Sequence, residues 1–194
     1  MTGPVTGPVL QATGVAKSYR GGDGKAIHVL EGVDLTLERG EMVAVIGASG
    51  AGKSTFLHVL GALERADAGE VRIAGESTLG ATDEALAELR SRQVGFVFQF
   101  HNLLPFLDAT DNVAIVLQLA GADITTARKR AGELLNDLEV GNRRHAMPAK
   151  LSGGEAQRVA IARALANSPR IILAGDQATY SVAGQIIDYS YEVT

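Results

Sequence analysis

The first part of the chain is patterned for β-structure. Val, Ile, Thr and Tyr are frequent between residues 10 and 37, and the run Gly21-Gly22-Asp23-Gly24 interrupts them. β-Branched and aromatic residues favour strands, and a short glycine-rich turn joins antiparallel neighbours. We therefore predict two or three largely antiparallel strands in this region.

Short apolar runs predict further strands. Residues 41–46 form a compact apolar run and residues 94–98 another, and both are typical of buried strands. Similar runs at residues 71–73 and 170–174 predict two more strands. The last such stretch, residues 186–191, fits a strand or a frayed helix equally well.

Helical periodicity alternates with these runs. It covers residues 53–63, then residues 82–90 with Thr82 as a plausible N-cap, then residues 108–138, and finally residues 153–166. In the third segment, one face carries Ala127, Ala131, Leu134, Leu135 and Leu138. Strands alternating with helices, with a helical insertion in the second half, indicate the α/β class.

Composition is that of an ordinary globular protein. The chain has 194 residues, 46% hydrophobic and 21% charged, enough for one core with a small appended subdomain. The net charge of −4 disfavours a broad nucleic-acid surface, and the basic run Arg128-Lys129-Arg130 is more typical of a solvated helix face. The absence of cysteine excludes disulfides and thiolate metal sites, and suits a reducing cytosol.

No segment is patterned for secretion or for crossing a membrane. Residues 1–9 lack the basic and apolar regions of a signal peptide, so we predict a flexible tail there. The longest apolar run, residues 113–120, is too short to cross a bilayer. Any membrane connection is therefore predicted to come through another polypeptide.

A glycine-rich loop separates the predicted strand at 41–46 from the helix that follows. It reads Gly47, Ala48, Ser49, Gly50, Ala51, Gly52, Lys53, Ser54, with Thr55 next, and matches the phosphate-binding pattern G-x-x-x-x-G-K-[ST]. Glycines let backbone amides turn toward phosphate oxygens at a helix N-terminus. Lys53 would supply charge to the β- and γ-phosphates, and Ser54 is placed to hold Mg²⁺. A glycine turn with a chance lysine is the alternative, which strand, spacing and helix together disfavour.

A second candidate anion site, called the signature below, is the run Leu151, Ser152, Gly153, Gly154, Glu155. Ser152 suits a helix N-cap, and the two glycines expose amides at the start of a helix. An ordinary capped helix explains the same residues when they are taken alone. Many nucleotide-binding enzymes have a phosphate loop, but very few classes of protein have both this loop and the signature.

The two motifs together resemble the ATP-binding domain of ABC transporters, and the resemblance covers residues 10–174. The chain looks most like the ATPases of lipoprotein-releasing and macrolide-export systems, although the cell-division ATPases share much of the pattern. The residues that carry this closer resemblance are 41–50, 95–99 and 101–105. The resemblance implies an α/β P-loop ATPase core over residues 10–194, with an N-terminal antiparallel β-subdomain and an inserted helical subdomain at about residues 100–166.

The resemblance also implies roles for single residues. Tyr19 corresponds to the aromatic ring that the family stacks on adenine, which is physically reasonable for a base. Gln99 corresponds to the glutamine that touches Mg²⁺ or water and senses the γ-phosphate. The apolar segment at residues 100–107 corresponds to the place where a permease coupling helix docks, with simple core packing as the alternative.

The implied mechanism requires ATP, Mg²⁺ and two copies of the domain. ATP lies on Lys53 of one subunit, while Ser152 and Gly153 of the other close over the γ-phosphate. A homodimer bound to a transmembrane permease at the cytoplasmic face of the membrane is therefore expected, with no nucleic-acid partner. Binding and hydrolysis of ATP would drive export or extraction of a substrate, which contacts the membrane subunits.

The chain departs from the family pattern at residues 175–177. Without a gap, Gly175 takes the place of the Mg²⁺ aspartate and Asp176 that of the general base. With a one-residue slip, Asp176 becomes the metal-side aspartate, Gln177 replaces the catalytic glutamate and Thr179 keeps its place. We prefer the second alignment, although glutamine can position water but cannot accept its proton.

The family's Leu-Asp turn and switch histidine have no counterpart, so the C-terminal part is predicted to be incomplete. Three hypotheses follow. The first is a transporter ATPase, and the second is a nucleotide-binding but hydrolysis-deficient ABC domain with a regulatory or degenerate role. The third, a different phosphate-loop enzyme such as a kinase, leaves the signature unexplained.

Overall fold

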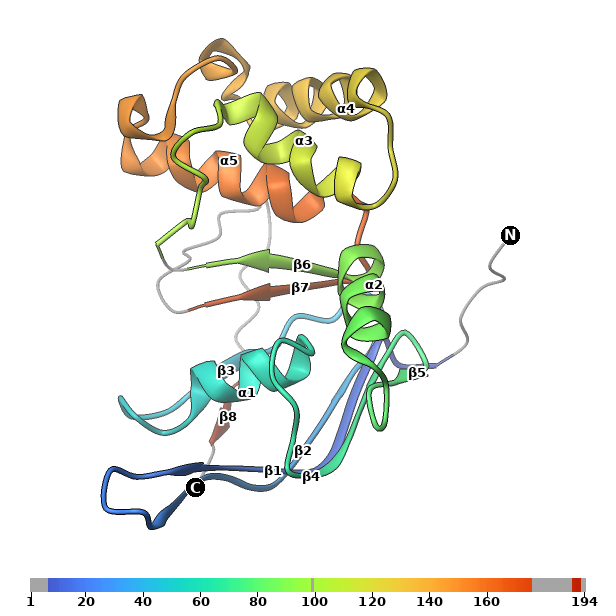
Figure 1. Cartoon of the computed structure of the whole chain (residues 1–194), viewed down its shortest axis with the longest axis vertical. Helices are drawn as coiled ribbons and strands as arrows, with labels where there is room; N and C mark the ends of the chain where they lie inside the picture. The colour runs from blue at the N-terminus through green and yellow to red at the C-terminus, as the bar shows by residue number, and fades with distance from the viewer. Residues whose placement is uncertain (1–6, 99, 176–189, 193–194) are drawn as a thin grey trace. The chain divides into compact units, whose positions relative to one another are not determined.

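The computed structural model describes residues 7–98, 100–175 and 190–192. The chain divides into two compact units (Figure 1): unit 1 comprises residues 1–86 and 179–194, and unit 2 comprises residues 87–178. Strands and helices are interspersed along the chain. This arrangement confirms the predicted α/β class.

Unit 1 is built on an antiparallel sheet with the strand order β2-β1-β4-β5. Its strands are β1 (Leu10–Arg20), β2 (Ala26–Leu37), β4 (Ala68–Ile73) and β5 (Glu76–Ser77). The predicted glycine turn joins β1 to β2, and the Gly21 amide donates to the Lys25 carbonyl at 2.8 Å. Leu10 on β1 pairs with Leu37 on one side and Ile73 on the other. The predicted antiparallel strands are confirmed.

The phosphate loop connects a short strand to a helix in the same unit. Strand β3 (Ala44–Ile46) pairs in parallel with β8 (Ser190–Glu192), and the loop leads from β3 into α1 (Lys53–Leu60). Helix α1 buries Phe56, Val59 and Leu60 and contacts β1 and β2. The loop is therefore anchored through α1 to the antiparallel sheet.

The prediction of a buried strand at residues 41–46 is correct only in part. The strand is limited to residues 44–46, and Ile46 is 44% exposed. Among the described residues, β3 has one neighbouring strand, β8, so less of its surface is covered than a central strand's would be. For the undecided stretch at residues 186–191, the structure gives a strand from residue 190, while 186–189 lie outside the described residues.

Unit 2 combines three packed helices with a pair of parallel strands. The strands β6 (Val94–Val97) and β7 (Ile171–Ala174) pair in parallel. Helix α2 (Asp83–Gln93), whose first turn belongs to unit 1, leads into β6. The helices are α3 (Ala109–Leu119), α4 (Ile124–Asp137) and α5 (Gly153–Leu165), with short 3₁₀ turns η1 (Gly141–Arg143) and η2 (Pro148–Lys150) before α5. Helix α5 contacts α3, α4 and β6.

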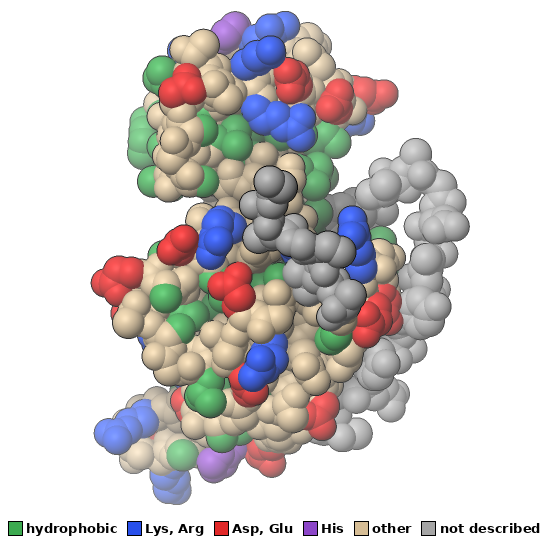
Figure 2. Space-filling view, turned by 90° about the vertical axis from the view of Figure 1, so that its right-hand side faces the viewer, with side chains coloured by type: hydrophobic (Ala, Val, Ile, Leu, Met, Phe, Trp, Pro, Cys, Tyr) green, Lys and Arg blue, Asp and Glu red, His purple; other side chains and the backbone are tan. Residues whose placement is uncertain are grey.

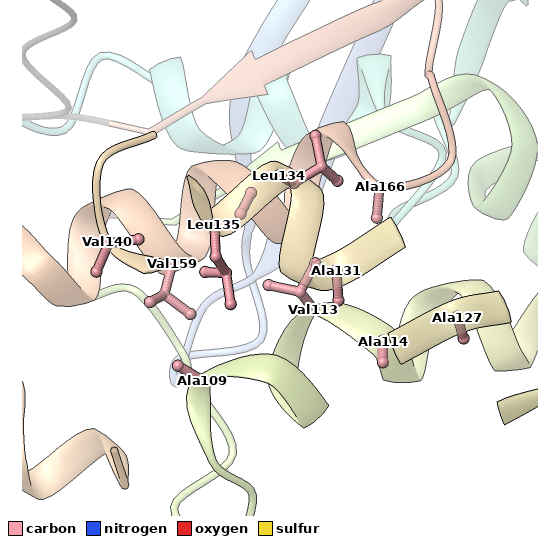
Figure 3. Close-up of a cluster of buried hydrophobic side chains, with 11 residues drawn as sticks. Ala109, Val113, Ala114, Ala127, Ala131, Leu134, Leu135, Val140, Val159 and Ala166 are labelled. Atoms are coloured by element: carbon pink, nitrogen blue, oxygen red, sulfur yellow. The ribbon is translucent and has the colours of Figure 1, made fainter. Parts of the chain in front are cut away.

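The core of unit 2 lies among α3, α4 and α5 (Figure 3). The predicted apolar face of the third helical segment is buried there, and Leu138 packs against it at the edge. The segment forms two helices because Gly121, with φ 97°, follows the end of α3. The Asp123 carboxylate then accepts the Thr125 and Thr126 amides at 3.0 Å and starts α4. The N-cap predicted at Thr82 is also present, since its hydroxyl accepts the Ala85 amide at 3.2 Å.

Candidate functional site

The phosphate loop curls around the amine of Lys53. Its Nζ donates to the carbonyl oxygens of Gly47 at 2.9 Å and Ala48 at 2.8 Å. The curl passes through left-handed backbone at Gly50, with φ 84°, and Gly52, with φ 83°. Helix α1 starts at Lys53 without a side-chain cap. An uncapped helix start beside a positive charge is suited to binding an anion, because the first amides of a helix have no partner within it.

Gly52 fixes the loop against the sheet. A Cβ at this position would lie 2.8 Å from the carbonyl oxygen of Val29 and 2.9 Å from its Cγ1. Val29 belongs to β2, so the start of α1 approaches that strand more closely than a side chain allows. Glycine is therefore required here by packing as well as by its left-handed conformation.

Tyr19 lies near the end of β1 and contacts the loop helix. Its hydroxyl donates to Glu64 Oε2 at 2.7 Å and lies near the side chain of Thr55, in the first turn of α1. Partial burial is the main cause that raises the pKa of the Tyr19 phenol; the Thr55 side chain acts in the opposite direction, and Glu64 raises the pKa further. The ring is 37% exposed, with Lys17 Nζ 5.7 Å from its centroid. The structure thus brings Tyr19 together with the residues of the predicted nucleotide set.

The signature forms the start of α5. The Ser152 hydroxyl accepts the Glu155 amide at 3.3 Å, while Glu155 Oε2 accepts the Ser152 amide at 2.7 Å. This reciprocal capping box marks the point where the segment that follows η2 ends and helix α5 begins. Ser152, Gly153 and Gly154 are exposed, whereas Leu151 packs against the core of unit 2.

The two signature glycines are not required by the packing of this chain. A Cβ built at Gly153 or Gly154 meets nothing within 4 Å, and neither residue has positive φ. An external group can therefore approach the backbone here without obstruction. This distinguishes them from Gly52, whose Cβ would collide with the chain itself.

Glu155 is held by its own chain. Its Oε1 lies 3.2 Å from Arg143 Nε, and the Arg143 Nη2 donates to the Lys150 carbonyl. The pKa of the Glu155 carboxyl is lowered mainly by the backbone hydrogen bond from Ser152. The charge of Arg143 lowers it by a smaller amount. Glu155 is therefore a carboxylate at neutral pH, directed toward Ser152 and Arg143.

The segment after Gln99 exposes apolar side chains. Gln99 itself lies outside the described residues, but Phe100 is 79% exposed, Phe106 71% and Leu104 37%. Arg163 on α5 donates to the carbonyls of His101 and Asn102, both at 2.6 Å. Those two residues have φ of 60° and 47°, which is unfavourable for residues other than glycine. The arginine fixes this strained turn.

Asn112 holds the far end of the same segment. Its side chain is fully buried; Oδ1 accepts the Leu104 amide at 2.7 Å, and Nδ2 donates to the carbonyls of Leu104, Leu107 and Asp108 at 3.1, 2.9 and 3.0 Å. One side chain on α3 thus satisfies the polar backbone of a loop that leaves its apolar side chains exposed.

We expect Asn112→Ala to lower the free energy of unfolding by about 3 kcal/mol, because it removes a fully buried side chain together with its four hydrogen bonds to the loop backbone. Urea denaturation measures this. Gln118→Ala, on the same helix, is the matched control and should change stability by less than about 0.5 kcal/mol. Equal stability of the Asn112 and Gln118 variants would show that the loop is held by other contacts.

The predicted metal ligands are only partly described. Ser54 lies at the second position of α1, whereas Gln99, Asp176 and Gln177 lie outside the described residues. The structure therefore does not decide between the two alignments around Asp176. Within the described ranges, no cluster of His, Cys, Asp or Glu could hold a metal ion. The curled loop and its lysine suit a triphosphate, and a serine hydroxyl suits Mg²⁺.

Three residues of the site region were not predicted from the sequence. Arg163 bonds to a turn about sixty positions earlier in the chain. Asn112 and Arg143 bond to segments within about a dozen positions of themselves, but no short motif that we recognised contains these pairs. The only local signal was a polar or charged residue on an otherwise apolar helix face, as for Asn112.

No described helix has the length and apolarity needed to span a bilayer. On the face shown in Figure 2, Lys and Arg side chains are interspersed with Asp and Glu. The basic run predicted as a solvated face is partly ion-paired, with Arg128 Nε 2.7 Å from Asp111 Oδ1 and Arg130 Nη1 3.6 Å from Glu133 Oε2.

Comparisons with known proteins agree with the motifs. A family model described as ABC transporter matches residues 30–179. The lipoprotein-releasing system ATP-binding protein LolD of Xylella fastidiosa, strain Temecula1, is 44% identical over 190 residues, covering 97% of this chain and 78% of the relative. The LolD of Porphyromonas gingivalis is 46% identical over 168 residues, covering 87% and 74%.

A solved structure shows the same fold. The dimeric ATP-binding cassette MJ0796, in a post-hydrolysis state bound to ADP and Pi, superposes with a TM-score of 0.79 at 41% identity, covering 85% of this chain and 72% of that one. The same cassette is also described as a bacterial ABC transporter cassette. The predicted resemblance and the predicted fold are both confirmed. The chain belongs to the ABC transporter family and is an ABC-type ATPase.

Proposed function

We propose that this chain is the ATP-binding subunit of a transporter that extracts or exports a lipoprotein or another hydrophobic substrate through a partner permease. The observation that carries the proposal is the loop curled around Lys53 at the uncapped start of α1. The similarity to LolD proteins supports lipoprotein release as the process served. No comparison supports the hydrolysis-deficient alternative.

ATP binding is assigned to unit 1. The amides of residues 47–55 would receive the phosphates, while the Lys53 amine would exchange its two carbonyl partners for phosphate oxygens. The exposed part of the Tyr19 ring would stack on adenine. Because the side chain of Thr55 lies near the Tyr19 hydroxyl, the ring would lie beside the loop helix before nucleotide arrives.

Magnesium would be held by Ser54, Gln99 and Asp176, and when bound it would neutralise charge on the transferred phosphoryl group. Gln177 would position the attacking water. These roles follow the alignment in which Asp176 is the metal-side aspartate.

The second copy supplies the signature. Ser152, Gly153 and Gly154 are exposed and unobstructed, so they can approach the nucleotide on a partner subunit. Because ATP would contact both subunits, its binding would stabilise the closed dimer, and hydrolysis would release it. The similar cassette structures, which are dimeric, support the pairing of two copies.

The exposed side chains of Phe100, Leu104 and Phe106 form the proposed permease-docking surface. They project from a loop that Arg163 and Asn112 hold in place. A docking segment with fixed backbone and exposed apolar side chains can transmit movement to a bound helix. The subunit would accordingly lie at the cytoplasmic face of the membrane.

The test is reconstitution with the membrane subunits of a lipoprotein-releasing system in vesicles that carry an acylated lipoprotein. We expect ATP-dependent release of the lipoprotein with the wild-type chain and none with Lys53→Ala. ATP turnover without lipoprotein release would retain the ATPase and reject this substrate class. Turnover no faster than that of Lys53→Ala would reject the proposal as a whole.

A further inference from the structure

The signature carries a negative charge where the proposed function places an anionic ligand. Glu155 lies in the first turn of α5, and one of its oxygens accepts the Ser152 amide at 2.7 Å. A carboxylate there stabilises the helix start by itself. It also repels the phosphates of a nucleotide brought by a partner subunit, since like charges brought together at an interface weaken binding.

Arg143 lies where it can offset that charge. It ends the η1 turn, its Nε lies 3.2 Å from Glu155 Oε1, and its Nη2 donates to the carbonyl of Lys150, the residue just before the signature. The Nε contact is an ion pair without the alignment of a hydrogen bond. One guanidinium thus joins the backbone that leads into the signature to the carboxylate within it.

The nearby Arg158 is engaged elsewhere. Its Nη1 lies 3.0 Å from both the Leu138 carbonyl and Glu139 Oε2, beyond the end of α4. Arg144 donates its Nε to the Gly141 carbonyl at 3.1 Å. Of Arg143, Arg144 and Arg158, Arg143 is the one that meets Glu155.

We infer that Arg143 is a positioning residue of the signature, which neutralises Glu155 so that the start of α5 can accept the partner's nucleotide. The inference rests on the proposed function, in which the signature closes over ATP held by a second copy. Loss of Arg143 would leave the helix start formed, because the capping box does not need it, but less able to receive an anion.

The experiment measures the dimer dissociation constant by sedimentation equilibrium at saturating ATP without divalent cations. Arg143→Met is expected to weaken the ATP-bound dimer roughly tenfold. Glu155→Gln removes the charge but keeps an acceptor for the Ser152 amide. The double variant Arg143→Met/Glu155→Gln is therefore expected to recover most of the lost affinity, and Arg144→Met serves as the matched control.

Recovery in the double variant distinguishes charge from structure, because removing a carboxylate cannot repair a misfolded turn. A double variant as weak as Arg143→Met would overturn the inference, and so would wild-type affinity in Arg143→Met. If Arg143→Met does not fold, Arg143→Lys replaces it, and a dimer more than about tenfold weaker despite the retained charge would likewise overturn it. A wild-type chain that dimerises no better with ATP than with ADP would reject the proposed function, and the inference with it.

Discussion

Lys53→Ala is expected to lower the affinity of the chain for ATP by about a hundredfold or more. A charge-assisted hydrogen bond contributes roughly 1.5–3 kcal/mol, and each 1.4 kcal/mol is tenfold in affinity. Lys53 has two carbonyl partners within the loop, at 2.9 and 2.8 Å, so the amine is already placed where phosphates would arrive. Its removal deletes the charge and also loosens the curl of the loop.

Isothermal titration of the purified chain with ATP measures this effect. Lys129→Ala is the matched control, because this lysine is exposed on α4 in the other unit, and it should bind ATP as the wild type does. If Lys53→Ala retained affinity within about threefold of the control, the loop would not be the nucleotide site.

Gly95→Ala is expected to destabilise unit 2 by about 3 kcal/mol, the upper part of the range for overpacked cores. A Cβ on Gly95 would lie 2.4 Å from the Ala164 carbonyl oxygen and 3.1 Å from Pro169 Cγ. The first contact is with backbone, so relief requires α5 to move away from β6. Because α5 begins with the signature, this strain also bears on the proposed site.

Urea denaturation followed by circular dichroism measures the loss. Gly132→Ala on α4 is the matched control, since a Cβ there meets nothing within 4 Å and alanine favours a helix by up to about 1 kcal/mol over glycine. The two substitutions should therefore act in opposite directions. Equal midpoints for both variants would mean that α5 lies farther from β6 than the structure indicates.

Local features of the fold were predictable from the sequence. The apolar face of α4 is buried as its periodicity indicates, and Ser152 and Glu155 form the capping box that Ser-x-x-Glu favours. The glycine turn before β2 and the Thr82 cap are of the same kind. In each case, the residues that determine the structure are within a few positions of one another.

Features that depend on distant partners were not predictable. Short apolar runs do not show which strand is the neighbour, so the exposure of β3 beside β8 was missed. Arg163 joins α5 to the turn at His101, and Arg143 joins the η1 turn to Glu155 in the first turn of α5. A single sequence reveals the chemical character of each arginine but not its partner.

The residues of the site were predicted mainly from family motifs and less from hydrophobic periodicity. The loop at residues 47–55 and the signature at 151–155 were located by residue type and spacing, and the family they imply is confirmed. Motifs do not reveal how a loop is supported. The hydrogen bonds from Lys53 to the loop carbonyls, and from Tyr19 to Glu64, became visible only in the structure.

The central claim is that each ATP lies between the loop of one subunit and the signature of another. Lys53→Ala disables a loop, and Gly153→Asp disables a signature by placing a carboxylate at the start of α5. The second variant is expected to fold, because a Cβ at Gly153 has open space and an acidic residue suits a helix N-terminus. Neither variant can form an intact site with itself, but a mixed pair can form one.

The most direct measurement is therefore ATP-dependent energy transfer between the two variants, each labelled with a different dye. The account predicts that ATP brings the mixed pair together, while either variant paired with itself gives no response. A mixed pair that responds no better than the single variants would contradict the shared site and the mechanism built on it.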